Sequence, residues 1–590
     1  MVLRGHRGSR VVRNYVPLSM RLRLRLRSLK AKLDQVCKRD CYGLAPASVI
    51  LLHIAIIVVL VLVLGVYRPR PLIITVQTDN AGRVVGRTVL LKDGLTKVHE
   101  FHNIHYAHAP IGRLRFRPPV RSIIRNNETE VVATENKEVE CVRSDSGVGD
   151  EDCLVLTVRS SSVNTTKPVL VWLHGGDIFQ HYNGLQHGYS FTSEMTAELD
   201  AVTVNINYRL GFLGFSSVEE LWDEEAGVYA NNGIRDIIAA LDWIQDNIAG
   251  FGGDPNSVTI IGESGGATAV LALACSPLAN NKFHAAIAQS PAPEMRFTYR
   301  EGNDFQRSIL EQAGCNQETV EERKQCLLRL PAYKFSAKHG VEVVNGSAYF
   351  EFPTTMGVDA EYIGLIMIDP TVVTVSPRDL GAADFHPSSP LQIIISSCAE
   401  ETYRVITWPR FPPFSSEEDL RNTLYPQIRS MSYNTSVTDI LLSQYSDQDP
   451  VKVWSLLTTD MRSTCPTNDV AEIMSGAANR TVYRLYVSHR SGSGLPPFHG
   501  YDTFAFFGYS GGRILLDPTV EDVDFRSHYI KMVKKFSHSQ GLEDGWGAFP
   551  EKTMIYENSD TISNISSIKP QQRQCKILAE LDLVKYGWQN

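Results

Sequence analysis

The stretch SVTIIGESGGATAVLALA, from Ser257 to Ala274, decides the fold. Val258, Ile260 and Ile261 form a short, β-branched apolar run of the kind that makes a buried strand. The run ends at once in Gly262–Gly266, and an Ala- and Leu-rich stretch of helical character follows. A strand, a G-x-S-x-G turn and a helix in direct succession are typical of a nucleophile elbow.

This turn would present one serine to a substrate. The small residues Gly262 and Gly266 let the strand and the helix approach closely around it. Ser264 then projects above the end of the sheet, where a base can reach its hydroxyl. The amides at the start of the following helix favour negative charge at the same point. The sequence therefore predicts Ser264 as a nucleophile.

Further strands and helices alternate around this elbow. Apolar β-type runs occur at 168–174, 201–207, 284–289, 391–398 and 482–487. Residues 234–248 have apolar side chains at helical spacing. Alternating strands and helices predict an α/β fold, a mostly parallel central sheet covered by helices on both faces. The mixed, more helical region between Pro291 and Pro390 is expected to form insertions above the nucleophile.

Composition and charge exclude several classes of protein. The chain has 590 residues, 43% of them hydrophobic and 21% charged, which excludes a disordered chain and fits a large α/β domain. Residues 1–46 carry twelve Lys and Arg against two Asp, so a net charge of +10 at this end leaves −17 on the remainder. An acidic main domain is not expected to bind nucleic acid by charge. The sequence predicts neither a metal site nor a cofactor.

The charge asymmetry coincides with an apolar segment. Residues 47–66 contain no Asp, Glu, Lys or Arg, and twenty such residues suffice to cross a bilayer as a helix. The basic flank precedes the segment, so the positive-inside rule predicts a cytoplasmic tail at 1–46, a signal-anchor helix at 47–67 and an extracellular or lumenal domain at 68–590. This is a single-pass type II topology. A cleaved signal peptide fits less well, because the apolar run is long and no A-x-A site follows.

The predicted outer domain carries marks of the secretory pathway. Disulfides are expected among its eight cysteines, although spacing alone does not give their pairing. Six N-x-S/T sequons predict glycosylation: Asn127, Asn164, Asn345, Asn434, Asn479 and Asn564.

From about Val76 to the end, the chain resembles the type B carboxylesterase and cholinesterase family of α/β hydrolases. The motifs that carry the resemblance occur in the family's order: 101–116 (FHNIHYAHAPIGRLRF), 151–154 (EDCL), 207–211 (NYRLG), 251–255 (FGGDP), 262–266 (GESGG), 498–500 (FHG) and 506–508 (FFG). Together these motifs are specific to the family.

The resemblance implies a catalytic triad and its support. Ser264 would be the nucleophile and His499 the base, with an acid between them in the chain. Family spacing favours Glu401 as the acid and leaves Glu400 as the alternative. The matching oxyanion amides are Gly176, Asp177 and Gly265, and the implied disulfides are Cys141–Cys153, Cys315–Cys326 and Cys465–Cys575. Cys275 and Cys398 remain as buried free thiols.

Several residues depart from the family pattern. Asp177 stands where the oxyanion loop of the family has Gly, and its carboxylate opposes the negative charge that acyl transfer develops there. Thr402 replaces Gly after the acid. The loop between Cys141 and Cys153 contains no Trp to match the choline-binding residue of the family, so acetylcholine is not an expected substrate.

Two functions are consistent with these residues. The favoured one is a membrane-anchored serine ester hydrolase that acts on small esters. The other is a weakly active or inactive recognition protein that binds a cell-surface protein, like the neuroligin, neurotactin and gliotactin relatives, of which neurotactin-like proteins share the type II topology. A homodimer is compatible with either. The presence of Ser264, a Glu and His499 favours the enzyme.

Overall fold

A computed structural model gives the architecture. It describes residues 72–124, 129–137, 139–144, 146–176, 189–295, 297–336, 366–382, 390–403, 416–430, 432–445, 448–508, 518–542, 545–556, 564–566 and 569–584. The chain divides into two units, Met1–Pro71 and Leu72–Asn590, and all described residues belong to the second. The predicted tail and signal-anchor helix therefore lie outside the described residues. Within the described part, no helix has the length and apolar character needed to cross a membrane.

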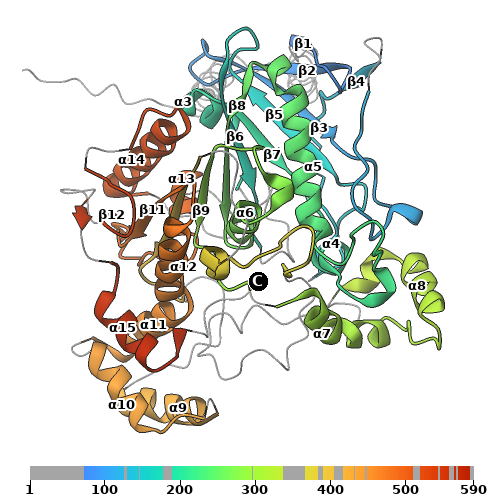
Figure 1. Ribbon diagram of the computed structural model, residues 1–590. Helices are drawn as coiled ribbons and strands as arrows, with labels where there is room; N and C mark the ends of the chain where they lie inside the picture. Colours follow the sequence, from blue (N-terminus) through green and yellow to red (C-terminus); the bar gives the residue numbers. More distant parts are fainter. Residues whose placement is uncertain are drawn as a thin grey trace, which may run out of the picture. The chain divides into compact units, whose positions relative to one another are not determined.

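The described strands form one mixed sheet in the order β1-β2-β3-β5-β7-β6-β8-β9-β10-β11-β12-β13, with β4 beside β2 (Figure 1). The six pairings from β7 through β6 to β12 are parallel. The other pairings along this order are antiparallel, and β4 pairs with β2 in parallel. The strands are β1 (Leu72–Gln77), β2 (Arg83–Leu90), β3 (Lys97–His105), β4 (Glu130–Val132), β5 (Val155–Ser160), β6 (Lys167–Leu173), β7 (Val202–Ile206), β8 (Gly253–Glu263), β9 (Ala285–Gln289), β10 (Leu391–Cys398), β11 (Arg480–Val487), β12 (Thr553–Tyr556) and β13 (Asn564–Ser566).

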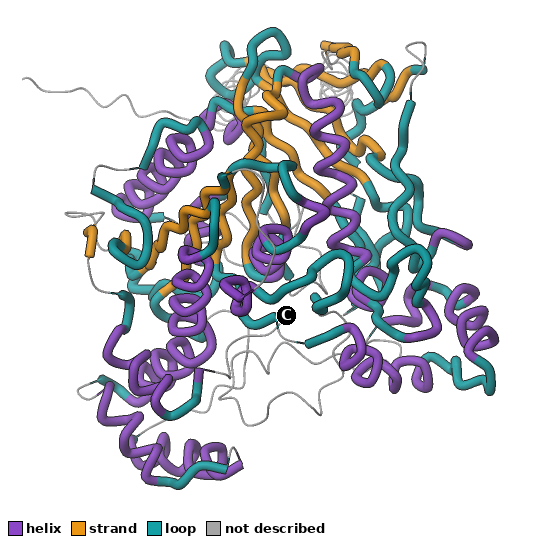
Figure 2. Tube along the Cα trace, in the orientation of Figure 1, coloured by secondary structure: helices purple, strands orange, loops and turns teal. Residues whose placement is uncertain are grey.

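Helices cover both faces of this sheet, as Figure 2 shows by the purple segments around the orange strands. The α-helices are α3 (Ser193–Leu199), α4 (Gly211–Phe215), α5 (Asn232–Asn247), α6 (Gly265–Ala274), α7 (Tyr299–Gln312), α8 (Val320–Arg329), α9 (Glu417–Ser430), α10 (Ser436–Leu442), α11 (Pro450–Thr459), α12 (Cys465–Gly476), α13 (Tyr501–Phe506), α14 (Val520–Ser537) and α15 (Gln572–Glu580). A π-helical turn, Asp460–Thr464, joins α11 to α12.

Strand β6 shows how one sequence builds two cores. Val169, Val171 and Leu173 pack with residues of α5, α6 and α12, whereas Leu170 and Trp172 pack with residues of α3, α13 and α14. Successive strand residues point to opposite faces, so a continuous apolar run supplies both cores. The expected sheet with helices on both faces is present, and its central part is the parallel one.

The predicted elements lie close to the observed ones. The helix expected at 234–248 is α5, and the strand expected at 391–398 is β10 with the same bounds. The elbow strand was expected to begin at Val258, but β8 begins at Gly253. A register shift between Lys167 and Val169 of β6 accommodates these extra residues.

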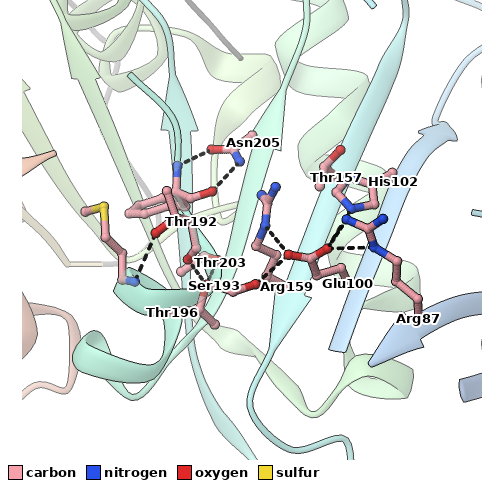
Figure 3. A network of polar contacts seen from close by, with 12 residues as sticks. Arg87, Glu100, His102, Thr157, Arg159, Thr192, Ser193, Thr196, Thr203 and Asn205 are labelled. Carbon is pink, nitrogen blue, oxygen red and sulfur yellow. Dashed lines mark hydrogen bonds and ion pairs between the residues drawn. The ribbon is translucent and has the colours of Figure 1, made fainter. Parts of the chain in front are cut away.

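A buried polar network fastens α3 to the sheet (Figure 3). The carboxylate of Glu100 on β3 accepts hydrogen bonds from Ser193 at 2.5 Å, from Arg87 at 2.7 and 2.9 Å, and from His102 at 3.0 Å. Arg159 lies 3.6 Å from the same carboxylate. Burial acts to raise the pKa of Glu100, but these hydrogen bonds and the charge of Arg159 hold it well below its usual range.

Three disulfides are present, with the pairing that the family resemblance implied, and both remaining cysteines of the described part, Cys275 and Cys398, are buried free thiols. The bonds are Cys141–Cys153, Cys315–Cys326 and Cys465–Cys575.

Of the sequons, Asn164, Asn434 and Asn479 are exposed, as a glycan requires. Asn127 and Asn345 lie outside the described residues, and of Asn564 only the backbone in β13 is described.

Candidate active site

The predicted elbow is present between β8 and α6. Ser264 has φ 53° and ψ −124°, a backbone conformation that non-glycine residues rarely adopt. Its amide donates to the carbonyl of Gln289 on β9 at 2.9 Å, and its carbonyl accepts from Thr268 in the first turn of α6 at 2.9 Å. The strained residue is thus held from both sides, which is typical of a nucleophile on a sharp strand-to-helix turn.

The glycines around Ser264 are required by close backbone contacts. A Cβ on Gly266 would lie 2.7 Å from the carbonyl oxygen of His174 and still closer to that of Leu173. A Cβ on Gly175 would lie 3.2 Å from Cβ of Ser264. The loop after β6 therefore lies directly against the elbow, where an oxyanion loop must be.

His499 and Glu401 form a hydrogen-bonded pair beside this elbow. Nδ1 of His499 lies 2.7 Å from Oε2 of Glu401, and the His499 amide donates to the Glu401 carbonyl at 3.2 Å. In the tautomer in which Nδ1 donates to this carboxylate, Nε2 is the nitrogen that can accept a proton. The Glu401 side chain is completely buried, and its Oε1 accepts from the Cys398 amide at 2.7 Å.

Glu400 points elsewhere. Its carboxylate forms an ion pair with Arg490, away from His499. Burial raises the pKa of Glu400, while the charges of Arg490 and Lys452 act in the opposite direction. Of the two carboxylates that the sequence left open, Glu401 is therefore the one that contacts His499.

Thr402 stands where the family pattern has Gly, and its side chain anchors the acid loop to α11. It is fully buried, and its hydroxyl lies 2.9 Å from the Ser455 carbonyl, 2.6 Å from Oγ1 of Thr458 and 3.1 Å from Oγ1 of Thr459. Its amide donates to Thr459 at 3.2 Å. Glycine could not make the hydroxyl contacts, so the departure from the family pattern gives the loop an anchor.

Two further carboxylates near His499 were not singled out from the sequence. Oε1 of Glu263 lies 3.5 Å from Nε2 of His499, and its position directly before Ser264 was the available signal. Asp502 is fully buried one turn after His499 and accepts from Ser396 at 2.8 Å. Burial and the charge of Glu401 raise the pKa of Asp502 to about 6, against the hydrogen bond from Ser396.

Two of the three predicted oxyanion residues, Gly176 and Gly265, lie within the described part of the chain. Gly176 follows β6 with φ 104°, and Gly265 is the first residue of α6. His174 stacks on Tyr208 with ring centroids 4.5 Å apart, and the Tyr208 hydroxyl donates to the His174 carbonyl at 2.6 Å, which fixes the start of the loop. Asp177 lies outside the described residues.

The sequence that forms this site is similar to those of known proteins. Residues 72–577 match the model of the carboxylesterase family. The chain belongs to the carboxylesterase family. The match covers the whole sheet and every element that carries the candidate site.

Several curated carboxylesterases are similar in sequence to part of this chain. Carboxylesterase 3B of Mus musculus is 32% identical over 316 residues, which cover 50% of this chain and 53% of that protein. Pyrethroid hydrolase Ces2e of Rattus norvegicus is 30% identical over 330 residues, 50% of this chain and 56% of that protein. Cocaine esterase of Homo sapiens is 37% identical over 233 residues, 36% of this chain and 40% of that protein. The chain spans about half the length of the curated relatives it matches.

Proposed function

We propose that this carboxylesterase-family chain is a serine hydrolase of small carboxylic esters. The single observation that supports the proposal most strongly is the hydrogen bond between His499 and Glu401 beside a strained Ser264 at an elbow. A buried carboxylate that orients a histidine is the part of the arrangement for acyl transfer that prepares a base for the serine.

The proposed reaction follows from these positions. The Ser264 hydroxyl attacks the ester carbonyl carbon while Nε2 of His499 takes its proton, and Glu401 stabilises the resulting imidazolium. The carbonyl oxygen becomes an oxyanion, which the amides of Gly176, Asp177 and Gly265 would bind. Collapse expels the alcohol, which takes the proton from His499 and leaves an acyl-serine. Water, activated by the same histidine, then releases the carboxylic acid.

Asp177 is expected to lower the rate of ester hydrolysis. A carboxylate 4 Å from the oxyanion would cost about 4 kcal/mol at an effective dielectric constant of 20. This is about as large as the contribution of one oxyanion donor, about 2.7–4 kcal/mol. We therefore propose weak turnover of ordinary esters. The same carboxylate could activate a water beside a phosphorylated serine, which would speed recovery from organophosphates.

A second candidate function is recognition of a cell-surface protein, with little or no hydrolysis. Asp177, at a position where the family pattern has Gly, favours this alternative. Under either function we propose a type II topology, with a cytoplasmic basic tail and a glycosylated domain outside the cell or in the secretory lumen, because the basic residues precede the apolar segment 47–66.

One assay separates the two functions. Hydrolysis of a short acyl ester by the full chain should be lost in Ser264→Ala and nearly lost in His499→Ala, because a triad acts as a unit. Asp177→Gly should raise ester turnover and slow reactivation after a phosphorylating inhibitor. A folded wild-type chain without turnover that binds to other cells would favour recognition. Hydrolysis that survives Ser264→Ala would refute the proposed mechanism.

A further inference from the structure

A pocket lies behind the acid loop, at the carboxyl ends of β10, β11 and β12. Its volume is 580 Å³, within the range of small-molecule sites. Ala399 and Glu400 form one wall, and Pro497 forms another. Parallel strands commonly place ligand sites at this edge. Neither Ser264 nor His499 lines the pocket, so it is separate from the candidate active site.

The charge of the lining points to an anion. Three basic side chains converge from different elements: Lys452 from α11, Arg490 from the loop after β11 and Lys569 from the loop before α15. Glu400 is the one acidic residue of the lining, and it forms an ion pair with Arg490. Lys569 forms an ion pair with Glu472 outside the lining. Lys452 is half-buried and forms no ion pair with any described residue, and its charge also acts on Glu400 across the pocket.

A buried hydroxyl supplies the second, independent observation. Tyr486 lines the pocket and is only 7% exposed, yet its hydroxyl has no hydrogen-bond partner among the described residues. Gln571, which also lines the pocket, lies close to that hydroxyl and acts to lower its pKa. Burial raises the pKa of Tyr486, so the hydroxyl stays protonated and remains a donor. A buried donor without a partner is costly, and a bound acceptor would relieve that cost.

We propose that this pocket binds a small organic oxyanion, a carboxylate or a phosphate, through Lys452 and the Tyr486 hydroxyl. Arg490 and Lys569 keep their own carboxylate partners, Glu400 and Glu472. The site is a second one, independent of ester hydrolysis, and the proposal stands whether or not Ser264 is a nucleophile.

The location of the pocket brings its ligand close to the acid loop. Glu400 precedes Glu401, and the Glu400 amide donates to the Pro497 carbonyl at 3.0 Å, two residues before His499. The two segments that hold the Glu401–His499 pair therefore meet in the wall of this pocket.

Calorimetric titration of the full chain at constant ionic strength tests the proposal. The probes are butyrate, its uncharged counterpart butyramide, and inorganic phosphate. We expect saturable binding of butyrate or phosphate and none of butyramide; the probe that binds more tightly identifies the oxyanion. Lys452→Gln should weaken binding about fivefold or more, and Tyr486→Phe about threefold, because each removes one donor to an anion.

The matched control is Lys531→Gln, which removes an exposed lysine of α14 far from the lining in sequence. It should leave the affinity unchanged, which excludes an effect of net charge alone. If the anion bound at the candidate active site near Ser264 instead of in this pocket, Lys452→Gln would not change its affinity. The proposal is overturned if neither anion saturates, or if Lys452→Gln and Tyr486→Phe both bind with the wild-type affinity.

Discussion

Replacing Gly266 by alanine tests the close contact between the elbow and the loop after β6. The added Cβ would lie 2.7 Å from the His174 carbonyl oxygen and closer to that of Leu173. Both atoms are backbone at the end of a central strand, so neither can rotate away as a flexible side chain would. We expect Gly266→Ala to lower the free energy of unfolding by about 1–3 kcal/mol, the usual cost of overpacking.

The same substitution elsewhere in the chain provides the control. Gly476 ends α12, and a Cβ there would meet no atom within 4 Å. Gly476→Ala should therefore leave stability unchanged or raise it by roughly 0.4–1 kcal/mol, because alanine restricts the unfolded chain. Urea unfolding of both full-length variants measures the two effects. If Gly266→Ala were as stable as Gly476→Ala, the contact that places the oxyanion loop against Ser264 would be wrong.

Three further predictions concern the acid loop and the buried network. Glu401→Gln should reduce hydrolysis of a short ester far more than Glu400→Gln, because Glu401 contacts His499 whereas Glu400 pairs with Arg490; equal losses in a steady-state assay would contradict this assignment. Thr402→Val should destabilise the chain by about 1–3 kcal/mol and Thr402→Ser by less, since only valine removes the hydroxyl that hydrogen-bonds to α11. Thermal unfolding of the two variants measures this difference, and equal stabilities would contradict the role of the hydroxyl. Glu100→Gln should cost about 3 kcal/mol or more at pH 7, because it leaves buried Arg159 unpaired. The lowered pKa of Glu100 means that its stabilisation is present above the unfolded pKa of about 4.3 and is lost as the pH falls below it. The difference in unfolding free energy between wild type and Glu100→Gln should therefore shrink in acid, and a difference that does not depend on pH would argue against this network.

Local sequence patterns predicted the fold where one physical signal dominated. The β-branched run before Gly262 and the glycines around Ser264 determine the elbow, because few other sequences allow so sharp a turn. The start of β8 was missed, since residues 253–257 contain Gly, Asp and Pro and have no strand pattern of their own. Their pairing with β6 is a long-range interaction that a local pattern does not contain.

The candidate site was predictable in its residues but not in its contacts. Sequence order and resemblance led to Ser264, His499 and two adjacent glutamates, but only the turn after β10 decides which glutamate faces the histidine. The anchoring of Thr402 to α11 depends on contacts with residues more than fifty positions away. The pocket behind the acid loop joins residues from 399 to 574, and no motif marks it.

Labelling with an active-serine fluorophosphonate tests the central claim, that Ser264 is a nucleophile activated by His499. The full chain would be treated with the probe, digested, and the modified residue located by mass spectrometry. The account predicts one modification, at Ser264, which disappears in Ser264→Ala and falls strongly in His499→Ala and Glu401→Gln. A folded chain that is not labelled at Ser264, or is labelled equally in the His499→Ala variant, would contradict it.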